Sequence, residues 1–446
     1  MTFTFYLKNP IDINEQLFYN ILEQRFDYCC EMIILRTILH SDCNGFYASV
    51  ESLLHPELRG KPLAVAGDAE NRHGIILAKN EEAKKYGVKT GEAIWIAKKK
   101  CPELQISEPH FDQYMRYSKL TKQMYAEYTD RVESFGLDEA WLDVTGNNRS
   151  GYEIAREIKE RVKYEMGITV SIGVSFNKIF AKLGSDYKKP DAITKINFDG
   201  KDGYKTKIWQ LPCEDLLYVG RATKKKLHTM GIYTIGDIAV THVNILKSNL
   251  GKWGETLHSF ANGLDSSPVA QFDQRPDVKS IGNSTTTPRD LCNYEDTKMI
   301  IHILCDSVSR RLRESGFRAG TVTISVRDKE LFSFTRQGKL KNFSNHTKDI
   351  RDKALELFRN NYSFKKPVRS LGVSVSKLIA DSAPLQLSFF EREDKHIREE
   401  NLDKALDGLK NRFGSFAVRP AFLMKDVNLS LINPKDDHII HPVGYF

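Results

Sequence analysis

Two adjacent acids, Asp138 and Glu139, interrupt the largely apolar stretch 135–144. Gly136 predicts a bend before the acids, and the residues from Trp141 onwards are typical of a strand. Because neighbouring side chains of a strand point to opposite faces, one of the two acids is expected to face a core unless the backbone kinks. Like charges in a half-buried site are costly, and a divalent cation that prefers oxygen ligands, such as Mg²⁺, would remove that cost.

A third acid, Asp42, has a matching context. It follows the apolar run 32–39, precedes a bend predicted at Asn44-Gly45, and lies just before a helix predicted from Phe46. An Asp-Glu pair by itself also suits a solvated turn before a strand. An acid at the end of a second strand favours the other interpretation, in which the acids share two metal ions that hold a triphosphate and activate a sugar hydroxyl for in-line displacement.

The segments around these acids resemble the two catalytic motifs of the Y-family translesion DNA polymerases of the DinB/UmuC class. The matching residues are Asp-Cys-Asn-Gly-Phe-Tyr-Ala-Ser-Val-Glu at 42–51 and Gly-Leu-Asp-Glu-Ala-Trp-Leu-Asp at 136–143, and the segment 170–190 is similar to the third motif of the family. The resemblance implies an α+β multidomain fold. It would be a right-hand polymerase with a ferredoxin-like palm, small fingers, a helix-hairpin-helix thumb and an α+β little finger.

The resemblance also implies the residues of a catalytic site. Two Mg²⁺ ions would be held by Asp42, Asp138, Glu139 and the backbone carbonyl of Cys43. Glu139 would complete the metal site and assist loss of the proton from the primer hydroxyl.

Four residues are expected to contact the incoming deoxynucleoside triphosphate. Tyr47 would pack under the sugar and exclude a 2′-hydroxyl, with Phe46 beside it, whereas an isolated Phe-Tyr pair also suits a core. Lys182 and Lys84 would neutralise phosphate charge as point charges, without the bidentate fork of arginine. For Lys84 a solvated helix face is the alternative.

The third motif predicts a strand, a short turn and a helix, in which Asn177 would cap or steady the turn. Lys188 and Lys189 follow this helix and precede Pro190, which ends it. We interpret these two lysines as cations that suit a helix C-terminus rather than as site residues.

The domain organisation follows from the motifs and the residues between them. We expect an N-terminal extension of no assigned function at 1–31, a palm at 32–46 and 111–205, fingers at 47–110, a thumb at 206–270, a linker at 271–280, a little finger at 281–380 and a C-terminal tail at 381–446.

The expected thumb contains a sequence typical of a helix-hairpin-helix. Gly220 would let backbone N–H groups approach a DNA phosphate at a helix N-terminus, with Arg221, Lys224 and Lys225 beside it. Lysines in a row suit a solvated helix face equally well.

A short peptide in the expected tail resembles the segment that docks into the bacterial sliding clamp. Gln386, Leu387, Phe389 and Phe390 carry this similarity. Apolar side chains in a charged tail are costly to expose without a pocket, and tethering to a ring on DNA raises the effective concentration of a weakly binding enzyme. The alternative is that these residues fold back on the little finger.

Composition is consistent with these expectations without deciding them. The net charge of +8 favours a polyanionic partner. The seven cysteines include no Cys-x-x-Cys pair, which suggests a reducing cytoplasm rather than a zinc or disulfide framework. No apolar run is long enough to span a membrane. We expect a cytoplasmic monomer.

The predicted function is template-directed, low-fidelity DNA synthesis across damaged template, as in the SOS response. Its partners would be primer–template DNA, deoxynucleoside triphosphates, the sliding clamp and SOS accessory proteins. The rival interpretations are a non-catalytic DNA-binding paralogue, an accessory-dependent subunit of a UmuC-like mutagenic polymerase, and a nucleotidyl cyclase. The intact acids argue against the paralogue, and the helix-hairpin-helix and clamp-like peptide argue against the cyclase.

Overall fold

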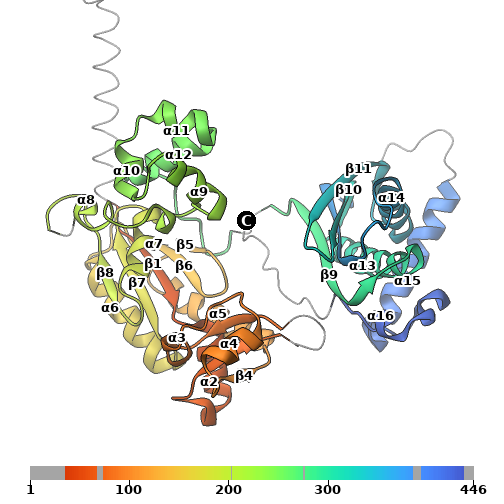
Figure 1. Cartoon of the computed structure of the whole chain (residues 1–446), viewed down its shortest axis with the longest axis horizontal. Helices are drawn as coiled ribbons and strands as arrows, with labels where there is room; N and C mark the ends of the chain where they lie inside the picture. Colours follow the sequence, from red (N-terminus) through yellow and green to blue (C-terminus); the bar gives the residue numbers. More distant parts are fainter. Residues whose placement is uncertain (1–35, 68–73, 202, 275–276, 385–392, 436–446) are drawn as a thin grey trace, which may run out of the picture. The chain divides into compact units, whose positions relative to one another are not determined.

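The computed structural model describes residues 36–67, 74–201, 203–274, 277–384 and 393–435 (Figure 1). The chain divides into two compact units, and each is considered by itself. Of the described residues, one unit comprises those within 36–60 and 112–274, and the other comprises those within 61–111 and 277–435. The residues 1–31 expected to form an extension lie outside the described part of the chain.

The first unit is built on a mixed sheet. Within the described residues its strand order is β5-β6-β1-β7-β8, antiparallel throughout except for the parallel pair β7 and β8. All residues of the two central strands β1 and β7 are buried, so helices must cover both faces. The bounds are Val132–Ser134 for β5, Glu139–Asp143 for β6, Ile38–Cys43 for β1, Val170–Ser175 for β7 and Ile193–Lys195 for β8.

Helices lie on the two faces of this sheet. Helix α7 packs on β1 and β7 on the face that carries His40, whereas α5 and α6 cover the face that carries Ser41. Gly173 of β7 permits the close approach of α7, because a Cβ there would lie 1.8 Å from the carbonyl oxygen of Ala181. The bounds are Phe46–Leu54 for α2, Phe111–Ala126 for α5, Gly151–Arg161 for α6, Val162–Met166 for η2 and Lys178–Tyr187 for α7.

A set of short helices completes the first unit. Their apolar side chains share a core with Phe176, which precedes α7, and with Phe180 in the first turn of α7. A capping box of Thr234 and Asp237 starts α10 after the hairpin that Gly231 turns with a φ of 77°. The bounds are Tyr204–Lys207 for α8, Cys213–Asp215 for η3, Arg221–Thr229 for α9, Ile235–Val240 for α10, Val243–Leu250 for α11 and Lys252–Ala261 for α12.

Residues 61–111 of the second unit form a small sheet with two short helices. The strand order is β3-β2-β4 among the described residues, and Ala64, Ile76 and Leu104 lie in the core beneath it. The side chain of Asn80 caps α3 by accepting a hydrogen bond from the backbone N–H of Ala83. The bounds are Leu63–Ala66 for β2, Ile76–Lys79 for β3, Glu81–Lys85 for α3, Ile94–Lys100 for α4 and Gln105–Ser107 for β4.

The C-terminal part of the second unit is an antiparallel sheet with the order β11-β10-β12-β9. Helices α13 and α14 pack against each other and against this sheet, over a core that includes Ile324 and Phe358. The bounds are Ser280–Leu291 for β9, Tyr294–Glu314 for α13, Phe317–Asp328 for β10, Ser333–Ser344 for β11, Thr347–Asn361 for α14 and Val368–Ala380 for β12.

Within the segment 381–446 expected to be a tail, the described residues 393–435 are folded. Lys410 of α15 pairs with Asp306 of α13 at 2.6 Å, and Leu423 and Leu429 join the core of the C-terminal sheet. The docking of α15 was not predicted from the sequence, because α15 makes its contacts largely through charged side chains, which are also typical of a solvated helix. The bounds are Glu393–Phe413 for α15, Ala421–Lys425 for η4 and Val427–Ser430 for α16.

The clamp-like residues Gln386, Leu387, Phe389 and Phe390 lie outside the described residues, so their docking stays a prediction. Across the ranges that the structure describes, no helix has the length and apolarity needed to cross a bilayer.

Candidate active site

The three acids predicted from the sequence converge at one edge of the first sheet. The register of β1 and β6 places Asp42 opposite Glu139, and the backbone N–H of Cys43 donates to the carbonyl of Asp138 at 2.9 Å. Gly136, with a φ of 114°, turns the chain between β5 and β6 and so sets Asp138 just before the strand. Residues almost 100 positions apart in the sequence are therefore neighbours here.

Two lysines face these carboxylates. The Nζ of Lys182, the residue predicted to contact a triphosphate, contacts Glu139 and lies 3.9 Å from Asp42. The Nζ of Lys189 lies 2.6 Å from Asp42 and 2.7 Å from Asp186. The sequence interpretation of Lys189 as a helix-end cation was incomplete, because the chain after α7 returns to the edge of the sheet beside Asp42.

Burial makes ionisation of Asp42 and Asp138 in this cluster unfavourable. It raises the pKa of Asp42 to about 7, although the neighbouring Lys189 acts in the opposite direction. Burial and then the charge of Glu139 also raise the pKa of Asp138. Cations that contact these acids relieve that cost, which is the property expected of a metal site.

Glu139 differs from the other two acids because its ionised form is supported. Burial acts to raise its pKa, but His40 and Lys182 outweigh this effect and lower the pKa to about 2. The Nε2 of His40 lies 3.2 Å from Glu139, and its Nδ1 lies 2.8 Å from the hydroxyl of Ser185. Burial lowers the pKa of His40 to about 4, so the imidazole is neutral at pH 7.

Sequence reasoning missed His40. The signal was present, since His40 precedes Asp42 by two residues on the same strand and therefore shares its face. A second missed residue is Lys122 of α5, whose Nζ donates to the carbonyl of Gly136 at 2.6 Å and so supports the turn before Asp138. Burial lowers the pKa of Lys122 to about 8.

The predicted aromatic pair begins α2. Gly45, with a φ of 51°, precedes the helix; Phe46 is buried, and the ring of Tyr47 stacks on Tyr114 at 4.2 Å between centroids. Burial and then the charge of Asp138 raise the pKa of Tyr47.

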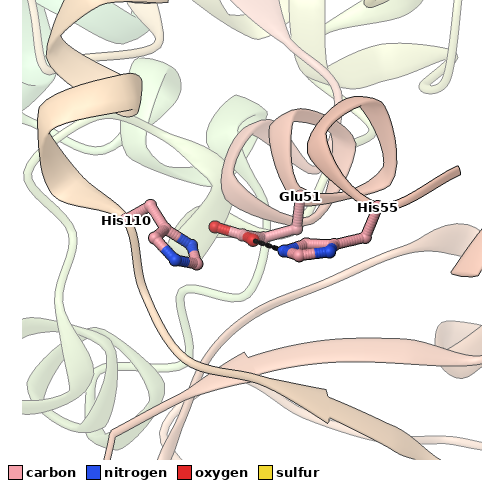
Figure 2. A group of neighbouring side chains, drawn as sticks. All are labelled: Glu51, His55 and His110. Atoms are coloured by element: carbon pink, nitrogen blue, oxygen red, sulfur yellow. Dashed lines mark ion pairs between the residues drawn. The ribbon is translucent and has the colours of Figure 1, made fainter.

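Tyr114 is held in place by a hydrogen bond to α2. Its hydroxyl donates to the buried carboxylate of Glu51, and the Nε2 of His55 lies 4.0 Å from the same carboxylate. Figure 2 shows Glu51 and His55 near the C-terminal end of α2, joined by this ion pair. The ring under Tyr47 is thereby fixed through α2 itself.

The remaining predicted residues lie on other elements. Lys84 belongs to α3 of the second unit, is exposed and pairs with Glu81 at 3.3 Å, so its role stays a prediction.

In the expected thumb, Gly220 precedes α9, and an open hollow on that helix is lined by Arg221, Lys224, Lys225, His228 and Thr229. Lys224 pairs with Glu214, whereas Arg221 and Lys225 are exposed. Their contacts with DNA remain predicted.

Three segments of the chain match known protein families. Residues 41–186 match the impB/mucB/samB family, 278–389 match the C-terminal domain of that family, and 214–265 match a domain described as "DNA polymerase-iota, thumb domain". DNA polymerase IV of Acetivibrio thermocellus is 52% identical over 400 residues, which are 89% of this chain and 100% of that protein. The chain belongs to the Y-family DNA polymerases. DNA polymerase IV of Clostridium acetobutylicum is 36% identical over 398 residues, 87% of this chain and 98% of that protein.

A solved structure agrees. A Y-family DNA polymerase chimera is similar to this chain with a TM-score of 0.67 and 25% sequence identity. The similarity covers 77% of this chain and 99% of the chimera. The α+β polymerase fold expected from the sequence is confirmed, as is the class of enzyme, a DNA-directed DNA polymerase. Membership of the family implies DNA and nucleotide substrates and a divalent metal ion. The paralogue and cyclase interpretations are set aside.

Proposed function

We propose that this Y-family enzyme carries out low-fidelity, template-directed DNA synthesis across damaged template by two-metal-ion nucleotidyl transfer. The observation that carries this proposal is the meeting of Asp42, Asp138 and Glu139 at one edge of β1 and β6, with Lys182 and Lys189 against them. Three acids and two lysines would provide both metal ligands and phosphate contacts in one place.

The residues present fit a pair of Mg²⁺ ions. The carboxylates of Asp42, Asp138 and Glu139 and the backbone carbonyl of Cys43 offer the hard oxygen ligands that Mg²⁺ prefers. Burial raises the pKa of Asp42 and Asp138, which is consistent with a need for cations, and two ammonium groups contact the cluster. When bound, Mg²⁺ would neutralise the triphosphate and make the primer hydroxyl easier to deprotonate.

The chain's own side chains have separate parts in this proposal. Glu139, kept ionised by His40 and Lys182, would accept the proton of the primer hydroxyl. Lys182 and Lys189 would turn from the carboxylates to the triphosphate and stabilise the charge that develops there. The ring of Tyr47, held by its stack on Tyr114, would lie under the sugar and exclude a 2′-hydroxyl.

DNA and protein partners belong to the same proposal. The N-terminus of α9 at Gly220, with Arg221, Lys224 and Lys225, would contact the DNA backbone. The peptide 386–390 would bind the sliding clamp, with SOS accessory proteins as further partners. The free thiols among the described cysteines suit a reducing cytoplasm.

Primer extension with Mg²⁺ and all four deoxynucleotides, on undamaged template and on template carrying one lesion, tests the proposal. Glu139→Gln should lower the rate about 10²- to 10⁴-fold, the range for loss of a positioned proton acceptor. Glu160→Gln, which removes a half-exposed acid of α6, is the matched control and should extend at the normal rate. Equal rates for Glu139→Gln and the unmodified chain would reject the assignment of Glu139.

Two further experiments test the proposed clamp binding and the need for accessory proteins. Deleting 386–390 should abolish stimulation by the clamp and spare basal extension; loss of basal extension would indicate that these residues fold back on the little finger instead. Extension that requires added accessory proteins would favour the accessory-dependent subunit over a self-sufficient polymerase.

A further inference from the structure

Outside the acid cluster, where η3 packs on α9, three side chains of the types that commonly ligate metals lie close together. Cys213 and Glu214 belong to η3, and His228 lies in the last turn of α9. One ligand atom of each residue lies within 4.8 Å of those of the other two. The candidate ligand atoms belong to a thiol, a carboxylate and an imidazole, so the cluster is not a set of acids alone.

The carboxylate of Glu214 is already oriented toward the thiol. Its Oε2 lies 3.7 Å from the Sγ of Cys213, while Lys224 donates to Oε1 from the middle of α9. A charged group that holds one oxygen of a carboxylate, and so directs the other toward the site, is an arrangement that orients metal ligands in known sites.

We propose that Cys213, Glu214 and His228 bind one Zn²⁺ ion. A mixed set of sulfur, nitrogen and oxygen ligands suits zinc, and three protein ligands leave the fourth position to water. The same set is a poor site for Mg²⁺, which prefers oxygen ligands only. On binding, the thiol of Cys213 gives its proton to solvent and the resulting thiolate donates an electron pair to the metal.

Solvent reaches the cluster from the side of α9. Glu214 and His228 are half-buried, and His228 lines the open hollow on that helix, whereas Cys213 is buried. The exposed cations Arg221 and Lys225 line the same hollow and oppose a divalent ion. Without zinc, the cluster is explained by the pairing of Glu214 with Lys224 and by packing of the thiol; the two explanations differ in whether the thiol becomes a ligand.

Bound zinc would tie η3 to the last turn of α9. Because α9 carries the residues proposed to contact the DNA backbone, the ion would hold that helix in one position relative to η3. This consequence rests on the proposed function, whereas the metal site itself does not.

Titration of the full chain with Co²⁺, in excess Mg²⁺ that occupies oxygen-only sites, tests the proposal. Thiolate-to-cobalt charge transfer gives near-ultraviolet absorption that carboxylates and imidazoles do not give. The unmodified chain should show this absorption with one ion per chain, and added Zn²⁺ should remove it. Cys213→Ser should abolish it, while Cys292→Ser, which removes an exposed free thiol, should leave it unchanged.

Further variants keep the test decisive if Cys213→Ser folds poorly. His228→Gln should also abolish the absorption, and Lys224→Met should weaken Co²⁺ binding about 10- to 100-fold, the usual effect of losing a group that orients a ligand. No charge-transfer absorption in the unmodified chain, or absorption that persists in a well-folded Cys213→Ser or His228→Gln, would overturn the proposal. Primer extension is read separately, so failure here would leave the polymerase assignment standing.

Discussion

Lys188 and Lys189 are adjacent in the sequence but differ in their surroundings. Lys188 is exposed at the end of α7, whereas Lys189 is half-buried and contacts Asp42. The carboxylates of Asp42 and Asp186 raise the pKa of Lys189, although burial alone would lower it. Its ammonium is therefore charged at neutral pH and can pair with a triphosphate.

We predict that Lys189→Ala lowers kcat/KM for the incoming nucleotide about 10- to 100-fold, because a charge-assisted hydrogen bond is worth about 1.5–3 kcal/mol. Lys188→Ala is the matched control and should stay within about twofold, as expected for a solvated side chain. Single-nucleotide primer extension measures both. Equal losses in the two variants would indicate a general effect of positive charge near the DNA rather than a specific contact.

The same cluster illustrates how an element positions a residue. Helix α7 carries Lys182 over the acids only because it packs directly on β7 at Gly173. A Cβ at that position would lie 1.8 Å from the carbonyl oxygen of Ala181 and 2.5 Å from the amide nitrogen of Ser185. Both are backbone atoms of the helix, so the whole element would have to move.

Gly173→Ala should therefore destabilise the protein by about 1–3 kcal/mol, as overpacking does, and lower activity through displacement of Lys182. Gly408→Ala is the matched substitution, because Gly408 faces open space within α15; it should be neutral or stabilising by up to about 1 kcal/mol. Thermal unfolding and primer extension check both. Unchanged stability in Gly173→Ala would show that α7 tolerates a shift away from β7.

At the scale of the whole molecule, the C-terminal segment 393–435 extends the fold of the second unit. His302 of α13 lies beneath it, with its ring edge-on to Phe422 of η4 at 5.1 Å, and its Nδ1 is buried without a hydrogen bond. Burial lowers the pKa of His302 to about 4; Asp306 acts against this shift, and Arg351, Lys410 and Lys298 add to it.

A histidine with a lowered pKa makes stability fall in acid. Because the unfolded chain protonates this imidazole near pH 6.5 and the folded chain near pH 4, its contribution is present above pH 6.5 and is lost as the pH falls toward 4. At pH 4 the loss is about 3 kcal/mol at most. We expect the Tm of the unmodified chain to fall between pH 7 and 4.5 more steeply than that of His302→Gln. Parallel curves would show that His302 does not contribute.

Local patterns in the sequence were sufficient for the catalytic strands, the turn at Gly136, the start of α2 at Phe46 and the cap at Asn177, because each depends on residues within a few positions. The convergence of Asp42 with Asp138 and Glu139 was expected from the acids' places beside two strands and from the resemblance to family motifs, and the β1–β6 register agrees with it. Roles assigned to Lys84, Gly220 and the clamp-like peptide stay predictions.

The sequence by itself predicted Asp42, Asp138, Glu139 and Lys182 as contacts for metal and phosphate, because acids, glycines and apolar runs have strong local preferences. Only the tertiary structure decided which charged residues lie inside the fold. From the sequence, Lys189 was interpreted as a helix-end cation, and no contacts were predicted for His40 or for the charged side chains of α15, since a charged or polar side chain looks the same in sequence whether water or a distant partner satisfies it. Contacts across more than 100 residues, from Asp42 to Lys189 and from Asp306 to Lys410, settle that question.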